Sequence, residues 1–489
     1  MKLILNLLIF FVFLQFVNAA QQQYQYGING GYYGWSGEKQ NQLYVEAGIQ
    51  SARMLFPYSF FEQWGMRILI DNHSFNKSLG MTDYVAFLTY NQSAGVYTLP
   101  TSLYEPIWSN GQVNKNNLWA VFINQSVSTY KDYITLLEIW NEPDFINDWR
   151  YSLTWWNSPP TAQQLVRFGG DIYTYIRLLR ITYEVTKRVA PSIYVTVGGL
   201  GYPQFLDAVL RYTDNSADGL TGINYIDAMS THFYPYLATS KTDSDSYVMA
   251  YTEHINAFKN VSKTRGFKPK YWVVTETGVS TKPFDNYYGS EVLQRNYFMK
   301  LPSISIINGV TQNHVFVTGD TDNEWFGLFY NFIGKDSAKM KDSAKAVRFW
   351  KQNMSNRVRS DSQSNLLVSQ LPSNVVGHAY VSLTNSTDFV YIIWANSSTY
   401  KYDEDTPSVK VTLKSSGEYK LIDYTGAYFK LAPFSNNSVT FTVDSTPILC
   451  YDTFSTHNED PVNSSSKLYT IFTISLIVLL LTINLLFNF

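Results

Sequence analysis

Residues 135–145 read TLLEIWNEPDF, an apolar run that ends abruptly in polar residues. A strand that is buried on both faces of a parallel sheet has this kind of continuous apolar run. Pro143 cannot donate a hydrogen bond to a neighbouring strand, so the strand must end before it. We therefore expect Asn141 and Glu142 to lie at the carboxyl edge of a parallel sheet, the edge at which α/β barrels build their active sites.

A second stretch repeats this pattern. Residues 271–280 read YWVVTETGVS, in which an apolar run is followed by Glu276 and then by Gly278. Two buried strands would then each bring one glutamate, Glu142 and Glu276, to the same edge. Glycoside hydrolysis needs two carboxyl groups: one gives a proton to the leaving oxygen, and the other attacks the sugar carbon or activates a water. The pair therefore predicts a catalytic site for carbohydrate.

The sequences WNEPD and TETG, far apart in the chain, resemble glycoside hydrolase clan A, the retaining β/α-barrel glycosidases. The order WNEPDF, a long helix and then SxHxY is most similar to family 39, with family 5 next. The similarity covers roughly residues 27–354. It implies a (β/α)8 TIM barrel and a retaining O-glycoside hydrolase, with Glu142 as general acid/base and Glu276 as nucleophile.

The two glutamates need opposite protonation states. Glu142 must hold a proton in its acid form, so we expect an apolar wall or a second negative charge to raise its pKa. Glu276 must be ionised and held by cations or hydrogen-bond donors. The resemblance implies that Arg53 pairs with this nucleophile, that Tyr234 donates a hydrogen bond to it and that His232 helps to place it.

Further contacts with the sugar are expected at the strand ends. The resemblance implies that Asn141 donates to the 2-hydroxyl of the sugar. Asp71 and Asn72 follow the apolar run 66–70, which we interpret as the third strand, so they would contact substrate from the same rim. The clan commonly ends its eighth strand in a tryptophan that forms the floor of the sugar site. Here that strand reads HVFVTGD, and Trp325 in the loop after it would take this place.

The rest of the chain alternates short apolar runs with helical patterns, as parallel βα units do. The candidate strands are residues 26–29, 49–56, 66–70, the run before Glu142, 192–198, 226–233, 270–276 and 309–317. The long irregular segment 74–114 is interpreted as a wall of the substrate cleft, because loops of this length are usually functional. Beyond residue 357, short alternating runs predict an antiparallel β-sandwich of about eight strands with a supporting role.

The expected order of segments is a signal peptide (1–20), the barrel (21–357), the sandwich (358–454), a polar linker (455–467) and a hydrophobic tail (468–489). The first segment has a long apolar core and then small residues, as secretory signals do. The tail is uncharged and fits a GPI-attachment signal, with a transmembrane anchor as the alternative. The protein is therefore expected to be secreted or attached to the extracellular face of the plasma membrane, which its Asn-X-Ser/Thr sequons also fit.

The amino-acid composition indicates which classes of binding partner this protein can have. The 489 residues are 45% hydrophobic and 16% charged, with a net charge of −2, which is typical of a globular protein and disfavours a nucleic-acid partner. Aromatic residues make up 17% of the chain and suit a carbohydrate site, although most of them would pack in the core. The single cysteine, Cys450, excludes an intrachain disulfide. No His/Cys cluster has metal-site spacing and no glycine-rich loop fits a phosphate, so neither a metal nor a cofactor is expected.

Two functions remain open from the sequence. The first is a monomeric, cell-surface β-glycosidase that acts on an oligo- or polysaccharide. The second is a GPI-anchored carbohydrate-binding or adhesion protein on a barrel that no longer catalyses a reaction. The distance between the two carboxyl groups discriminates between them, because about 5 Å supports a retaining enzyme and more than about 10 Å excludes a glycosidase.

Overall fold

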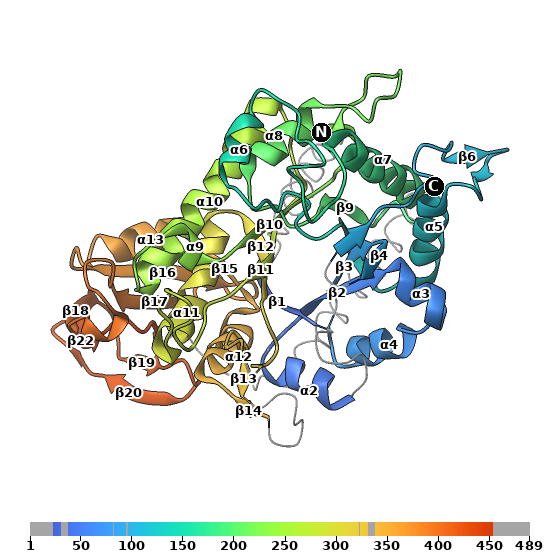
Figure 1. Cartoon of the computed structure of the whole chain (residues 1–489). Coiled ribbons are helices and arrows are strands. Elements are labelled where there is room, and N and C mark those ends of the chain that lie inside the picture. Colours follow the sequence, from blue (N-terminus) through green and yellow to red (C-terminus); the bar gives the residue numbers. More distant parts are fainter. Residues whose placement is uncertain are drawn as a thin grey trace, which may run out of the picture.

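The computed structural model describes residues 23–30, 38–81, 83–93, 96–321, 323–330 and 338–452 (Figure 1). The expected signal peptide, polar linker and hydrophobic tail lie outside these residues. In the described part of the chain, no helix combines the length and the apolar character needed to cross a bilayer.

Eight parallel strands form the barrel that the alternating pattern predicted. Their order is β10-β11-β12-β1-β2-β3-β8-β9, and a parallel bridge between Leu200 and Thr231 joins the segment after β9 to β10. The strands are β1 (Gln25–Asn29), β2 (Ser51–Pro57), β3 (Asp83–Thr89), β8 (Ile134–Ile139), β9 (Tyr194–Val197), β10 (Met229–Phe233), β11 (Trp272–Thr277) and β12 (Val310–Val315).

One main helix follows each strand and returns the chain along the outside of the barrel (Figure 1). These helices are α2 (Glu38–Glu46), α4 (Ile70–Ser78), α5 (Leu118–Tyr130), α7 (Ile172–Val189), α8 (Pro203–Arg211), α10 (Ser244–Arg265), α11 (Glu291–Ile307) and α12 (Asp342–Met354). Four of them begin at a side chain that accepts a hydrogen bond from the backbone N–H three residues later, which satisfies a donor of the first turn. The four capping residues are Asn117, Asp171, Asp243 and Ser290.

Shorter elements occupy the loops that extend from the carboxyl ends of the strands, so these loops surround one rim. They are α3 (Tyr58–Trp64) after β2, the hairpins β4–β5 (Asn91–Ser93, Val96–Thr98) and β6–β7 (Trp108–Ser109, Gln112–Val113) after β3, α6 (Arg150–Thr154) after β8, α9 (Pro235–Ala238) after β10 and β13–β14 (Phe329–Tyr330, Lys339–Met340) after β12. A 3-10 turn, η1 (Gly222–Tyr225), precedes β10.

The prediction of the third strand is wrong. Residues 66–69 form a turn and α4 begins at Ile70, whereas the third strand, β3, lies inside the segment 74–114 that we expected to be irregular. Leu69 and His73 are fully buried one helical turn apart, while Ile68 is 46% exposed. The apolar residues of this segment therefore follow the period of a helix rather than that of a buried strand.

Side chains fill the barrel in layers. An apolar layer lies nearer the amino ends of the strands and contains Val85, Leu136, Ala228 and Val273. Residues two positions apart on a strand face the same side. The next layer toward the carboxyl ends therefore contains Glu138, Ser230 and Thr275, and Glu138 accepts a hydrogen bond from the Thr275 hydroxyl at 2.6 Å. The barrel thus changes from apolar to polar directly below the rim.

Residues 357–452 form an antiparallel β-sandwich, as predicted. One sheet has the order β15-β16-β17-β23-β19-β20 and the other β18-β22-β21. The elements are β15 (Arg357–Arg359), α13 (Asp361–Val368), β16 (Val375–Ser382), β17 (Phe389–Ala395), η3 (Asp403–Asp405), β18 (Val409–Lys414), β19 (Tyr419–Ile422), β20 (Tyr428–Ala432), β21 (Phe434–Ser435), β22 (Ser438–Val443) and β23 (Ile448–Asp452). Cys450 is a free thiol in the core of the sandwich, and burial raises its pKa.

A buried ion pair between two helices of the barrel also receives hydrogen bonds from the sandwich. Lys300 on α11 lies 2.7 Å from Asp245 at the start of α10, and their side chains are 0% and 6% exposed. Asp245 also accepts hydrogen bonds from the Trp394 indole at 2.9 Å and from the backbone N–H of Ser397 at 2.8 Å. These contacts satisfy a buried charge across the boundary, so the two parts depend on each other for stability.

Asp245→Ala should destabilise the chain, because it leaves Lys300 buried without its nearest carboxylate. Removing one partner of a buried ion pair costs roughly 3–5 kcal/mol. Urea unfolding, followed by circular dichroism and by tryptophan fluorescence, measures the loss. Glu253→Ala changes an exposed residue of the same helix and should alter the free energy of unfolding by less than about 0.5 kcal/mol. Equal stability of the two variants would contradict this role of the ion pair.

Candidate active site

The segment after β8 carries Glu142 in a constrained turn. Trp140 and Glu142 have φ angles of 73° and 47°, a region that residues other than glycine rarely adopt. Two hydrogen bonds hold the turn: the Trp140 N–H donates to the Leu88 carbonyl at 2.9 Å, and the Glu142 N–H donates to the Gly198 carbonyl at 2.7 Å. Backbone strain of this kind persists where the surrounding structure enforces it, and it gathers at functional sites.

Two glycines after β9 leave the space that the end of β8 and the His232 ring occupy. A Cβ atom on Gly198 would lie 2.4 Å from the carbonyl oxygen of Ile139. A Cβ atom on Gly199, where φ is 63°, would lie 2.0 Å from Nε2 of His232. Glycine is therefore needed at both positions for the close approach of the β8 end and of the His232 ring.

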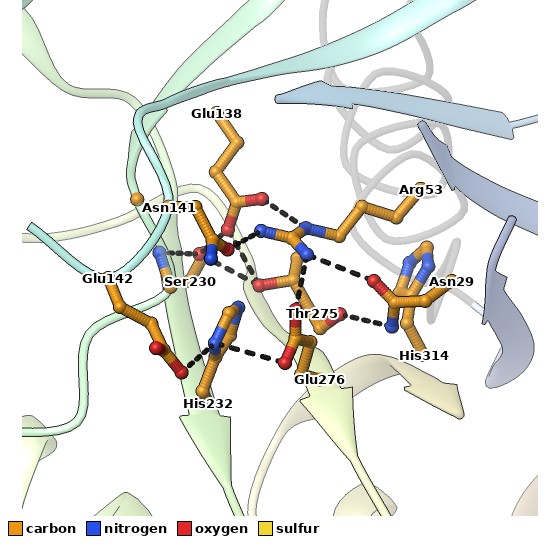
Figure 2. Close-up of polar contacts among 12 residues, drawn as sticks. Asn29, Arg53, Glu138, Asn141, Glu142, Ser230, His232, Thr275, Glu276 and His314 are labelled. Atoms are coloured by element: carbon orange, nitrogen blue, oxygen red, sulfur yellow. Dashed lines mark hydrogen bonds and ion pairs between the residues drawn. The ribbon is translucent and has the colours of Figure 1, made fainter. Parts of the chain in front are cut away.

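Arg53 on β2 is the centre of the hydrogen-bond network beneath the rim (Figure 2). Its Nε donates to the carboxylate of Glu138, and its Nη2 donates to Asn141 Oδ1 at 2.7 Å. Its Nη1 donates to Asn29 Oδ1 at 2.9 Å and to Glu276 Oε1 at 2.7 Å. The expected ion pair between Arg53 and Glu276 is therefore present, and one guanidinium also positions Asn141.

Glu138 is a part of the site that the sequence analysis did not single out. It lies within the apolar run of β8, is 0% exposed, and accepts hydrogen bonds from Arg53, Ser230 and Thr275. A carboxylate is rarely buried unless a cation and donors surround it. A glutamate in the middle of an apolar strand therefore predicts a buried cation beside it, and this feature of the sequence could have identified Glu138 as part of the site.

Glu276 lies near the end of β11, where the pairing with both neighbouring strands is irregular. Such a bulge can turn a side chain that would otherwise face outward. Oε1 of Glu276 accepts from Arg53, and Oε2 accepts from the Tyr234 hydroxyl at 2.8 Å. The expected hydrogen bond from Tyr234 is therefore present, and two donors hold the carboxylate in one orientation.

His232 lies between the two glutamates (Figure 2). Its Nδ1 is 2.9 Å from Glu142 Oε1 and 3.6 Å from Glu276 Oε2. A carboxylate oxygen of Glu142 lies within 4.8 Å of one of Glu276. The side chains of Glu142 and Glu276 are 21% and 12% exposed, so solvent reaches both. The two carboxylates therefore belong to a single open site.

The electrostatic surroundings of Glu142 differ from the expectation. Arg167, in the loop before α7, donates from Nη1 to Glu142 Oε2, while His232 bonds Oε1. Burial disfavours the charged carboxylate, but the hydrogen bond and charge of His232, with the charges of Arg167 and Arg53, outweigh it and hold the pKa of Glu142 below its ordinary value. The expected rise in the pKa of Glu142 is therefore wrong: Glu276 lies close by, but the surrounding cations outweigh burial.

Aromatic residues border the carboxylates. Phe316 directly follows β12, and its ring packs edge-on against that of Tyr234 at 6.0 Å. Phe316 therefore occupies the strand-end position for which we proposed Trp325, whose half-buried ring lies in the next loop, 5.2 Å from Lys282 Nζ. Tyr97 on β5 packs against the Trp140 ring at 5.6 Å. The segment 74–114 thus brings one aromatic ring close to the turn that carries Glu142, and its role as a wall of the substrate cleft stays a prediction.

Asp71 and Asn72 do not lie at the strand ends. They belong to α4, the helix that returns the chain from β2 to β3, and Asp71 is exposed. Oδ1 of Asn72 accepts a hydrogen bond from Asn41 on α2 at 3.3 Å. The predicted substrate contacts of Asp71 and Asn72 are therefore wrong, because they depended on a strand that the chain does not form.

Glu142, His232 and Glu276 also come close enough together to ligate a metal ion. Each carboxylate, however, already pairs with a guanidinium, Arg167 on Glu142 and Arg53 on Glu276. A divalent cation bound here would lie close to both guanidinium groups and would compete with them for the same two carboxylates. The arrangement therefore favours acid–base and nucleophilic chemistry over metal binding.

No protein-family model and no curated protein sequence matches this chain. Solved structures resemble it in fold. A family 39 glycoside hydrolase from the gut symbiont Bacteroides cellulosilyticus WH2 has a TM-score of 0.59 and 16% identity over 88% of this chain and 81% of its own. A family 30 endoxylanase from Clostridium papyrosolvens C71 has a TM-score of 0.51 and 15% identity over 88% and 96%.

A third example is the family 51 α-L-arabinofuranosidase AbfB from Bifidobacterium longum, with a TM-score of 0.53 and 10% identity over 88% of this chain and 95% of its own. The resemblance to the barrels of clan A glycoside hydrolases, which the sequence motifs suggested, is therefore confirmed at the level of the fold.

His232 should titrate at higher pH than the other buried histidines. Burial opposes its charge, but the Glu276 charge and the hydrogen bond to Glu142 outweigh burial and raise its pKa above 6.5. Burial lowers the pKa of His254 and of His314 to about 3. Imidazole NMR resonances measure these values, and Glu142→Gln should lower the pKa of His232.

This raised pKa has a consequence for stability. The protonated form of His232 adds stability that is fully present below the pKa of the unfolded chain and is lost as pH rises through the native pKa. A His232 resonance that titrates together with that of His254 would contradict the ion pair with Glu142.

Proposed function

We propose that the chain is a glycoside hydrolase that cleaves β-glycosidic bonds of an oligo- or polysaccharide with retention, through a covalent bond between the sugar and Glu276. One observation carries this proposal: carboxylate oxygens of Glu142 and Glu276 lie within 4.8 Å of each other at one open rim. The two carboxyl groups of retaining glycosidases are about 5 Å apart, whereas those of inverting enzymes are about 6.5–9.5 Å apart.

In the first step, Glu276 attacks the anomeric carbon while Glu142 gives a proton to the leaving oxygen. Arg53 and Tyr234 hold the attacking carboxylate in place before the reaction. The His232–Glu142 pair supplies the proton, since Nδ1 of protonated His232 lies 2.9 Å from Glu142 Oε1. The bond from the anomeric carbon to the leaving oxygen breaks, and its electron pair takes up that proton.

In the second step, Glu142 is an ionised carboxylate and accepts a proton from the attacking water. The water oxygen forms a bond to the anomeric carbon, the bond to Glu276 breaks, and the proton returns to the His232–Glu142 pair. The adjacent His232 stabilises the ionised form that this step requires. The cations around Glu142 therefore suit its role as a base, while His232 provides the proton for its role as an acid.

Asn141 and the aromatic border would position the sugar. The amide oxygen of Asn141 accepts from Arg53, which leaves the amide NH2 to donate to the 2-hydroxyl, a contact that strengthens in the oxocarbenium-like transition state. The half-buried ring of Tyr97 packs on Trp140, close to Glu142, and that of Phe316 packs on Tyr234, which bonds Glu276. We propose these two rings as surfaces on which a sugar ring packs. Trp325 in the adjacent loop remains a candidate for a more distant sugar contact.

The similar structures support the class of reaction rather than one sugar, since they include a family 30 endoxylanase and a family 51 α-L-arabinofuranosidase. Secretion, with or without attachment to the outer face of the plasma membrane, is part of the proposal. The apolar sequences of residues 1–20 and 468–489 support it.

Alanine variants of the two glutamates separate their roles. Glu276→Ala should abolish turnover of aryl glycosides, because no nucleophile remains. Glu142→Ala should lower the turnover of substrates with poor leaving groups by about 10²–10⁴-fold. Azide should restore its turnover of activated substrates, because this small anion can attack the glycosyl enzyme without a base. Hydrolysis of a panel of aryl β-glycosides measures both effects.

Asp71→Ala is the matched control, because this carboxylate lies on the outer helix α4 and its loss should leave turnover unchanged. Full activity of Glu276→Ala or of Glu142→Ala would remove that residue from its proposed role. A wild-type chain that binds glycans but hydrolyses no glycoside would favour the alternative of a binding protein.

A further inference from the structure

Arg167 lies at the edge of the candidate site, beside the proton donor. It belongs to the loop between α6 and α7, and its Nη1 donates to Glu142 Oε2. The guanidinium carbon lies 3.9 Å from the centre of the Phe145 ring, and the side chain of Arg167 is 29% exposed. The contact with Phe145 and the bond to Glu142 restrain the guanidinium, which stays partly exposed to solvent.

The bonding of Arg167 differs from that of Arg53. All three nitrogens of the Arg53 guanidinium donate to side chains beneath the rim, and the side chain is 1% exposed. Within the described residues, the contact from Nη1 to Glu142 is the only hydrogen bond of Arg167. Among the described residues, its Nε and Nη2 groups therefore have no acceptor. They lie in one plane, the arrangement that recognises a carboxylate or a sulfate with two parallel bonds.

The proposed reaction removes the charge that balances Arg167. Glu142 must carry a proton before it can protonate the leaving oxygen, and a neutral carboxylic acid does not neutralise the guanidinium. The charge of Arg53 stays balanced during this step, because the carboxylate of Glu138 remains beside it. A charge that loses its partner in a partly desolvated site raises the free energy of that state. A bound group that carries a negative charge would restore the balance at the moment when the reaction needs it.

We infer that Arg167 binds a negatively charged substituent, a carboxylate or a sulfate, on the sugar whose bond is cleaved. This inference rests on the proposed glycosidase function and names its substrate class as an acidic glycan. Binding of the substituent draws Arg167 away from Glu142 Oε2, so the same contact that recognises the substrate also releases the proton donor. Arg167 is thus a specificity-determining residue of the site.

The test uses the full chain and 4-nitrophenyl β-glycosides in the gluco and galacto configurations, each as the neutral sugar, the 6-carboxylate and the 6-sulfate. Wild type should prefer a charged member over its neutral counterpart by about tenfold or more in kcat/KM. Arg167→Gln should lower kcat/KM for that charged member by about 10- to 100-fold more than it lowers kcat/KM for the neutral sugar. The carboxylate and sulfate arms identify which anion is bound.

Arg150→Gln is the matched control, since it removes the same charge from the nearby helix α6, where the side chain is 73% exposed. It should leave kcat/KM unchanged for both the charged and the neutral glycosides. The inference is overturned if wild type hydrolyses neutral sugars as well as charged ones, or if Arg167→Gln lowers both rates by the same factor. In that case Arg167 serves only as a partner of Glu142.

A binding measurement keeps this inference separate from the proposed function. Calorimetric titration of wild type and Arg167→Gln with D-glucuronate, D-galacturonate, the 6-sulfates and the neutral sugars needs no turnover. If no glycoside is hydrolysed, the proposed function fails and binding alone decides the inference. Tighter binding of a charged sugar that is lost in Arg167→Gln supports it, and equal binding of charged and neutral sugars overturns it.

Discussion

The buried guanidinium of Arg53 is the constraint on which the site depends. A cation in the interior of a barrel must be balanced by carboxylates, and Glu138 below it and Glu276 at the rim do so from two different strands. Because the guanidinium is a rigid planar fork, its hydrogen bonds to Asn29 and Asn141 have fixed directions. The nucleophile and the donor for the sugar 2-hydroxyl are thus positioned by one group.

The two arginines beside the carboxylates have different surroundings, and the difference matches what each glutamate must do. The proposed nucleophile Glu276 is ionised before each attack, and its partner Arg53 is buried and bonded on every nitrogen. Glu142 gains and loses a proton in each cycle, and its partner Arg167 is partly exposed and bonded to it alone among the described residues. A contact that must change during the reaction is therefore placed where solvent or substrate can replace it.

Much of the site could be predicted because its main signals are local. Glu142 and Glu276 each lie at the end of an apolar run that a proline or a glycine terminates. In a parallel barrel, the carboxyl ends of all strands lie at the same rim. Glu138 was missed because it lies inside such a run, where a single charge is easily read as part of the apolar strand. Arg167 could not be found, because its contact with Glu142 depends on the path of a loop. The third strand was misplaced because short apolar runs fit a strand and a helix equally well.

The stereochemistry of the first product tests the central claim most directly. Proton NMR can follow the anomeric signals while the wild-type chain hydrolyses an aryl β-glycoside, before the free sugar equilibrates between its two anomers. Displacement by Glu276 and then by water inverts the anomeric carbon twice, so the β-anomer should appear first. First appearance of the α-anomer would mean that water attacks directly, and would contradict a covalent intermediate on Glu276.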